Sequence, residues 1–248
     1  MNFNYYTIFY CTFASWFITF ATHIAARYLV NTPIFPRIET ETHPILQKLF
    51  GLKQTMRLTA YNHAVAAVIY VFFMQFFYVI TPTLSIEQAC ALTLFYITIA
   101  ITIITDFYTY LISTLVTLYL VPAVLFYAYK GYLGISLYES IITALIVGFS
   151  MYAINYIYTT RKGTPAFGEG DRDLLIYIAT FMGGFPTLFI IFYASLIGSL
   201  WGIIALITKR HISFCSYTLP FGTCLGFGAF IHQFISFFYG PTWLSYLS

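Results

Sequence analysis

The chain has 248 residues, of which 60% are hydrophobic and only 8% are charged. An ordinary soluble domain carries about 25% charged residues, so the composition excludes a soluble enzyme and favours a protein of the lipid bilayer. A formal charge of +3 is compatible with nucleic-acid binding. The basic residues stand in short segments between apolar runs, however, where membrane orientation explains them better. We therefore expect the lipid bilayer, and no nucleic acid, as a partner.

Apolar runs recur along the whole chain and predict an all-α, multi-pass membrane protein. We expect a single integral membrane domain over residues 1–248, because little polar sequence is left for a soluble domain. About eight transmembrane helices are predicted, near residues 1–30, 58–80, 86–105, 111–129, 135–158, 172–182, 187–207 and 219–238.

The distribution of charge predicts the orientation of these helices. The one long polar segment, residues 31–57, is basic. With eight crossings, the first, third, fifth and seventh loops share one side of the membrane, and this side collects the Lys and Arg residues apart from Lys130. Cytoplasmic loops carry the excess of positive charge. We therefore expect residues 31–57 in the cytoplasm and both termini outside.

Two aspartates lie at helix ends on this predicted cytoplasmic face. Asp106 ends the third helix and Asp171 begins the sixth. Two neighbouring carboxyl groups can share one proton, so that the ionised member activates a water and the protonated member polarises a peptide carbonyl. Helix dipoles favour the anion at Asp171 and the neutral acid at Asp106. Gly168 and Gly170 have no side chains and would let an extended substrate backbone approach.

Other uses of these residues fit the same sequence. Asp171 could simply cap a helix, and Asp106 could be an interfacial carboxylate. A proton-coupled transporter would also use such a pair, as a relay. The five histidines and four cysteines lack the spacing of a metal site, so neither a metal nor another cofactor is expected.

Four stretches together resemble the type IV prepilin peptidases, a family of membrane aspartic proteases. Residues 168–175 resemble the family pattern G-x-G-D-x-K-L-L, and Thr105-Asp106 with residues 112–117 resembles the other catalytic aspartate and its downstream L-P-D-x-L-T. Residues 194–202 resemble the glycine-spaced seventh helix, and residues 219–226 resemble I-P-F-G-P-F-L-A. Presenilin-like proteases share G-x-G-D, but the context Pro220-Phe221-Gly222 favours the prepilin group.

The resemblance implies a peptidase core over residues 86–239 with Asp106 and Asp171 as the catalytic pair. It also implies support of the active site by Gly168, Gly170, Pro220, Phe221 and Gly222. The expected activity is removal of the leader from prepilin-like or pseudopilin proteins, after a glycine that precedes a hydrophobic helix. The expected location is the inner or cytoplasmic membrane of a bacterium or archaeon, with the active site facing the cytoplasm.

The chain departs from the family pattern at several positions. Asp173 stands where the pattern has lysine, residues 112–114 replace L-P-D, and Thr223 replaces the second proline of P-F-G-P. Bifunctional members carry paired C-x-x-C motifs in a zinc module of the first cytoplasmic loop, which is associated with N-methylation. Residues 31–57 contain no cysteine, which argues against zinc and against methyltransferase activity. A homologue that binds prepilin without cutting it is an alternative.

Overall fold

The computed structural model describes residues 85–208 and 219–239, together with residues 17, 18, 21, 22, 25, 69–71 and 73. The chain separates into two compact units, residues 1–85 and residues 86–248, and almost everything described belongs to the second. The first two predicted helices and the 31–57 loop lie almost wholly outside the described residues. The prediction of a single domain over residues 1–248 therefore stays a prediction.

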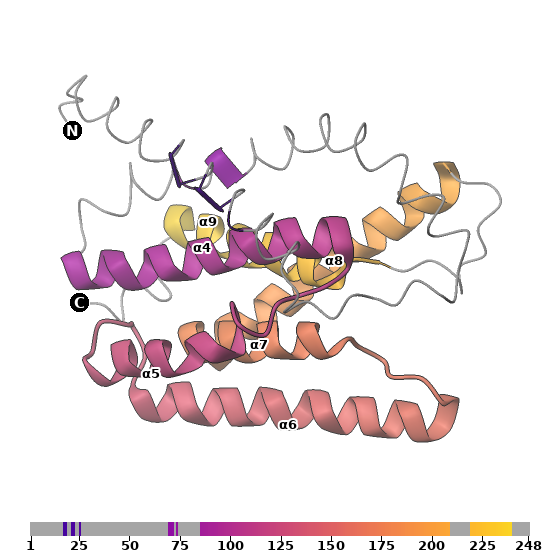
Figure 1. The fold of residues 1–248 in the computed structure, drawn as a ribbon, viewed down its shortest axis with the longest axis horizontal. Coiled ribbons are helices and arrows are strands. Elements are labelled where there is room, and N and C mark those ends of the chain that lie inside the picture. The colour runs from indigo at the N-terminus through magenta and orange to yellow at the C-terminus, as the bar shows by residue number, and fades with distance from the viewer. Residues whose placement is uncertain are drawn as a thin grey trace. The chain divides into compact units, whose positions relative to one another are not determined.

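The second unit is built of helices in its described part (Figure 1). The helices are α4 (Ile86–Thr109), the 3₁₀ helix η4 (Leu118–Leu120), α5 (Val121–Tyr129), α6 (Leu137–Lys162), α7 (Glu169–Met182), α8 (Gly184–Thr208) and α9 (Phe221–Tyr239). They lie close to the helices predicted from residue 86 onward. The all-α fold class is confirmed for the described part of the chain.

One predicted helix is much shorter than expected. Residues 111–117 were predicted as helical but form turns, in which Val116 N–H donates to the Ser113 carbonyl and the Thr117 hydroxyl donates to the same carbonyl at 3.2 Å. Hydroxyl side chains that bond to the backbone compete with helix formation. Pro122 lies in the first turn of α5, where proline is tolerated, and it disfavours helix immediately before it.

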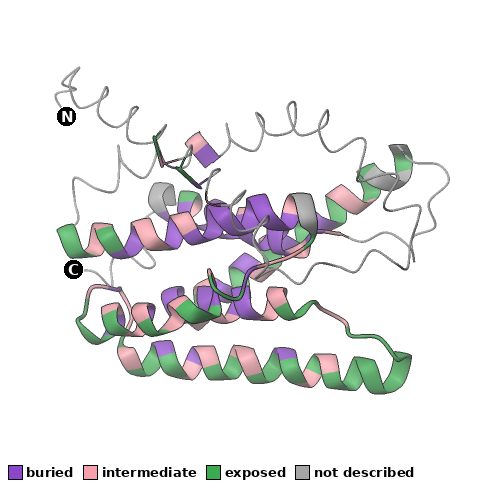
Figure 2. Ribbon diagram, in the orientation of Figure 1, coloured by how far each residue is buried: buried purple, intermediate pink, exposed green. Residues whose placement is uncertain are grey.

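Helix α7 occupies the interior of this unit. Its residues 173–175 and 177–182 are buried, and they pack against α6, α8, α5 and α9. Phe95 of α4 stacks on Tyr177 and on Phe181 of α7, with ring centroids 6.0 and 4.5 Å apart. Figure 2 shows that the buried residues gather on α4, α7 and α9. These three helices form the core that positions the site.

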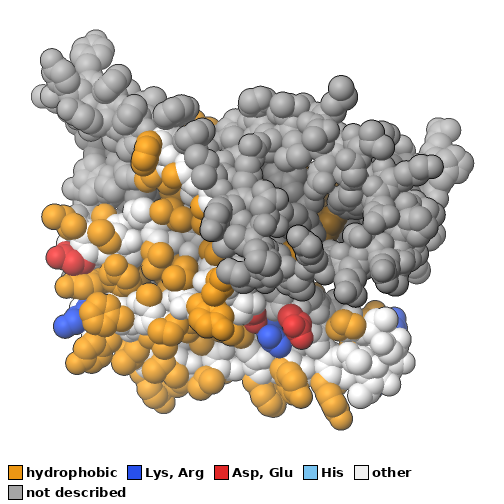
Figure 3. Space-filling view, in the orientation of Figure 1, with side chains coloured by type: hydrophobic (Ala, Val, Ile, Leu, Met, Phe, Trp, Pro, Cys, Tyr) orange, Lys and Arg blue, Asp and Glu red, His pale blue; other side chains and the backbone are white. Residues whose placement is uncertain are grey.

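Three described helices are long and apolar enough to cross a membrane, over Ile86–Phe107, Leu137–Lys162 and Gly184–Ile204. In α6 and α8 only 17% and 22% of the apolar window is buried, against 72% in α4. Exposed hydrophobic side chains are spread over the described surface in Figure 3, as expected for helices that face lipid. Helix α7 has 14 residues, fewer than the roughly 20 that a full crossing needs. The total of eight crossings remains a prediction.

Candidate active site

Asp106 lies near the C-terminal end of α4 and is 4% exposed. Its Oδ2 accepts hydrogen bonds from the Thr223 backbone N–H at 2.5 Å and from the Thr223 hydroxyl at 2.9 Å. Thr223 is in the first turn of α9, where backbone N–H groups have no partner within the helix. The buried carboxyl group is therefore held by the N-terminus of another helix.

Asp171 lies in the first turn of α7 and is half-buried. Its Oδ2 accepts the backbone N–H of Gly168, the residue before the helix, at 3.3 Å. The pKa of Asp171 is raised from its ordinary value to about 7, chiefly by burial and also by the nearby charge of Asp106, against the opposing effect of hydrogen bonds from the backbone of Gly168 and Gly222. Asp171 thus titrates near neutral pH although it is also a helix cap.

The two aspartates are brought together where the ends of α4, α7 and α9 meet. They are close enough for the charge of one to act on the other. Gly222 of α9 lies beside both: its backbone hydrogen-bonds to Asp171, and a side chain added at this glycine would place a carbon 3.1 Å from Asp106 Oδ2. A residue with a side chain at position 222 would therefore crowd the pair.

The other residues expected to support the site surround this junction. Gly168 caps α7, and Gly170 packs so closely on Ile112 that a side chain there would approach Ile112 Cβ to 2.7 Å. The rings of Phe221 and Phe167 lie 5.6 Å apart and connect α9 to the loop before α7. The Pro220 carbonyl accepts the Cys224 N–H at 3.3 Å and so begins α9.

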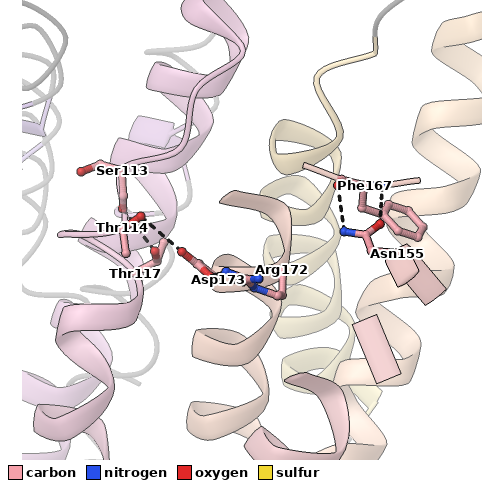
Figure 4. Close-up of polar contacts among 7 residues, drawn as sticks. All are labelled: Ser113, Thr114, Thr117, Asn155, Phe167, Arg172 and Asp173. Carbon is pink, nitrogen blue, oxygen red and sulfur yellow. Dashed lines mark hydrogen bonds and ion pairs between the residues drawn. The ribbon is translucent and has the colours of Figure 1, made fainter. Parts of the chain in front are cut away.

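Asn155 is a supporting residue that the sequence did not reveal. From α6, its Nδ2 donates to the Phe167 carbonyl at 3.0 Å and its Oδ1 accepts the Phe167 N–H at 2.9 Å, as Figure 4 shows. The amide side chain thus acts as donor and acceptor for the two backbone groups of Phe167. Asn155 therefore fixes the loop that leads into Asp171. A lone asparagine in an apolar helix was the only signal in the sequence.

Thr223 is the second such residue, and the sequence did contain a signal for it. The family pattern has proline at this position, and proline has no backbone N–H. Threonine supplies both an N–H and a hydroxyl, and both bond to Asp106. The departure from the family pattern thus adds two donors to the predicted catalytic carboxyl group.

Thr114 and Asp173, two further departures from the family pattern, contact each other. The Thr114 hydroxyl, in the loop after α4, donates to Asp173 Oδ2 at 3.2 Å (Figure 4). The other oxygen of Asp173 accepts Nε and Nη2 of Arg172, at 3.2 and 3.0 Å. Asp173 is 3% exposed, so its charge is paired and hydrogen-bonded as a buried carboxylate requires. These contacts fasten the loop to the start of α7.

Within the described part of the chain, no group of three or more His, Cys, Asp or Glu side chains could hold a metal ion. Residues 90–203 match the model of the type IV leader peptidase family, a range that contains both aspartates. No curated protein and no solved structure matches the chain.

Proposed function

Because residues 90–203 match the model of the type IV leader peptidase family, we propose that the protein is a membrane aspartic endopeptidase that removes the leader of prepilin-like or pseudopilin substrates. The observation that carries this proposal is the meeting of Asp106 and Asp171 from two different helices, close enough to influence one another. We place the reaction at the cytoplasmic face of a bacterial or archaeal membrane, in keeping with the charge distribution of the loops.

The contacts favour Asp106 as the ionised member of the pair and Asp171 as the proton donor. This is the reverse of the assignment expected from the helix ends. Thr223 gives Asp106 two close donors, and a hydrogen bond to a charged group contributes about 1.5–3 kcal/mol, whereas a helix dipole contributes about 0.3–1 kcal/mol. Asp171, with a pKa of about 7, holds a proton over much of the neutral range.

Hydrolysis then needs no covalent intermediate. Asp106 removes a proton from a water as the water oxygen attacks the peptide carbonyl carbon, and Asp171 gives its proton to the carbonyl oxygen, which yields a neutral diol. In the second step Asp106 passes its proton to the leaving nitrogen as the C–N bond breaks. One hydroxyl of the diol returns a proton to Asp171. Both carboxyl groups end in their starting states.

A substrate anchored in the bilayer suits this site. Asp106 lies near the end of α4, whose length and composition suit a membrane crossing. A substrate with its own apolar helix in the bilayer would present the peptide bond next to that helix at a similar depth. Such positioning lowers the entropic part of the barrier.

The test is leader removal from a prepilin-like protein encoded beside this one, co-expressed with wild type, Asp106→Asn or Asp171→Asn. We expect cleavage by wild type and its loss in both variants, scored by gel shift and by the mass of the new N-terminus. Glu169→Gln is the matched control, because Glu169 is an exposed carboxylate two residues before Asp171, and it should cleave as wild type does.

Two results would contradict the proposal. Normal processing by either aspartate variant would exclude the paired mechanism. No processing by wild type would instead favour a homologue that only binds prepilin, or a proton-coupled transporter that uses the same pair. Proton uptake by proteoliposomes containing the protein separates these two alternatives.

A further inference from the structure

Ile112 packs against glycines on both sides of the aspartate pair. It belongs to the loop after α4 and is half-buried. Gly170 directly precedes Asp171, and a side chain there would lie 2.7 Å from Ile112 Cβ. Gly222 directly precedes Thr223, and a side chain there would collide with Ile112 Cδ1 and approach Asp106 Oδ2 to 3.1 Å. Ile112 thus fills the space that the two glycines leave beside the carboxyl groups.

The position of Ile112 is fixed by contacts of its own loop. Thr114 donates to Asp173, which is buried on α7 and paired with Arg172 (Figure 4). A loop fastened to α7 two residues after Ile112 cannot easily move its isoleucine away from Gly170. Ile112 therefore forms an apolar wall beside the two glycines.

A cleaved peptide must bring its carbonyl group within hydrogen-bonding reach of both carboxyl groups. The side chain of the residue that supplies this carbonyl projects from the adjacent carbon, and so it enters the space next to the pair. Ile112 already occupies part of that space.

We infer that Ile112 determines substrate specificity, by limiting the residue before the cleaved bond to one with little or no side chain. The inference rests on the proposed peptidase function and assigns to one residue the preference for glycine at this position. An isoleucine wall discriminates by size alone, and one methylene in an apolar pocket changes the preference about 10–200-fold.

The experiment compares kcat/KM for substrates with glycine or alanine before the cleaved bond. Wild type should strongly prefer glycine. Ile112→Ala should reduce the glycine-to-alanine ratio at least about tenfold, and the ratio of the two kcat/KM values is the readout, whatever the variant's activity on the glycine substrate alone. Ile112→Val removes the Cδ1 methyl that packs on Gly222. Ile112→Val should also reduce the glycine-to-alanine ratio, but less than Ile112→Ala does. It is the variant to use if Ile112→Ala folds poorly.

Ile135→Ala is the matched control. Ile135 is also a half-buried isoleucine that packs on a glycine, because a side chain at Gly183 would lie 3.4 Å from Ile135 Cγ2. It should keep the wild-type ratio. An unchanged ratio in Ile112→Ala and Ile112→Val, with the glycine substrate still cleaved, would overturn the role of Ile112 alone. Failure of wild type to cleave the glycine substrate would overturn the proposed function and this inference with it.

Discussion

Asp106 and Asp171 are held by different kinds of contact. Asp106 lies near the end of the 24-residue helix α4, and its donors come from Thr223, 117 residues further along the chain. Asp171 lies at the start of α7, and its side-chain Oδ2 accepts the N–H of Gly168, only three residues before it, in addition to the contact with the backbone of Gly222 in α9. The geometry of Asp106 therefore depends on the packing of α9 against α4, whereas that of Asp171 depends also on the loop before its own helix.

This difference separates the two roles in the proposed mechanism. In the proposed mechanism the ionised form of Asp106 is favoured by the N–H and hydroxyl donors of Thr223, because hydrogen bonds to a charged form stabilise it. Burial and the nearby charge of Asp106 raise the pKa of Asp171 to about 7, so this carboxyl group holds its proton below that pH. A substitution of Thr223 should thus impair the base, and one that loosens the loop before α7 should impair the acid.

Among residues that support the two aspartates, the largest effect is expected from Thr223→Val, which removes the hydroxyl donor to Asp106 and keeps the backbone N–H. A hydrogen bond to a charged group contributes about 1.5–3 kcal/mol, so kcat should fall about 10- to 100-fold. Thr223→Ser retains the hydroxyl and should recover most of the activity. Equal rates for the valine and serine variants would show that the hydroxyl does not support the ionised Asp106.

A smaller effect is expected from Asn155→Leu, which leaves the N–H and carbonyl of Phe167 without their partners. Neutral hydrogen bonds contribute about 0.5–1.5 kcal/mol each, and misplacement of Asp171 should lower kcat about tenfold. KM should change little, because Asn155 acts on the loop and not on the substrate. Asn155→Asp keeps the acceptor for the Phe167 N–H, so its kcat should lie between that of wild type and that of Asn155→Leu. Wild-type kcat in Asn155→Leu would mean that α7 positions Asp171 without help from α6.

The sequence predicted the all-α class and the approach of Asp106 and Asp171. Both predictions rest on strong signals: long apolar runs, and glycines next to an acidic residue at a helix start. The turns at residues 111–117 escaped prediction, because their apolar composition resembles that of a helix and only the hydroxyl groups and Pro122 oppose it. Ile112, which packs from this loop against Gly170 and Gly222, could not be recognised for the same reason.

Contacts between distant residues were the other part that the sequence could not supply. Asp173 and Thr114 each looked like an isolated departure from the family pattern, yet they form one hydrogen bond across 59 residues. Likewise, the role of Thr223 could be recognised only from its hydrogen bond to Asp106. Spacing along one helix predicts which residues share a face, but it does not say which loop will lie against that face.

The smallest effect concerns stability and tests the state of Asp171. A carboxyl group whose pKa is raised from 3.8 to about 7 on folding favours the folded state fully below about pH 4 and loses this contribution as pH rises towards 7. Asp171→Asn removes the titration. The variant should therefore gain stability relative to wild type as pH rises from 4 to 8, whatever constant offset the substitution itself introduces.

Three units of pKa correspond to an upper limit of about 4 kcal/mol, and because water reaches a half-buried side chain we expect of order 1 kcal/mol. That corresponds to about 2–4 °C for a protein of this size. Thermal unfolding in detergent at pH 4 and pH 8 measures it, with Glu169→Gln as the exposed carboxylate for comparison. A difference between variant and wild type that does not change with pH would show that Asp171 is already ionised below neutrality. The assignment of donor and base would then revert to the one that the helix ends favour.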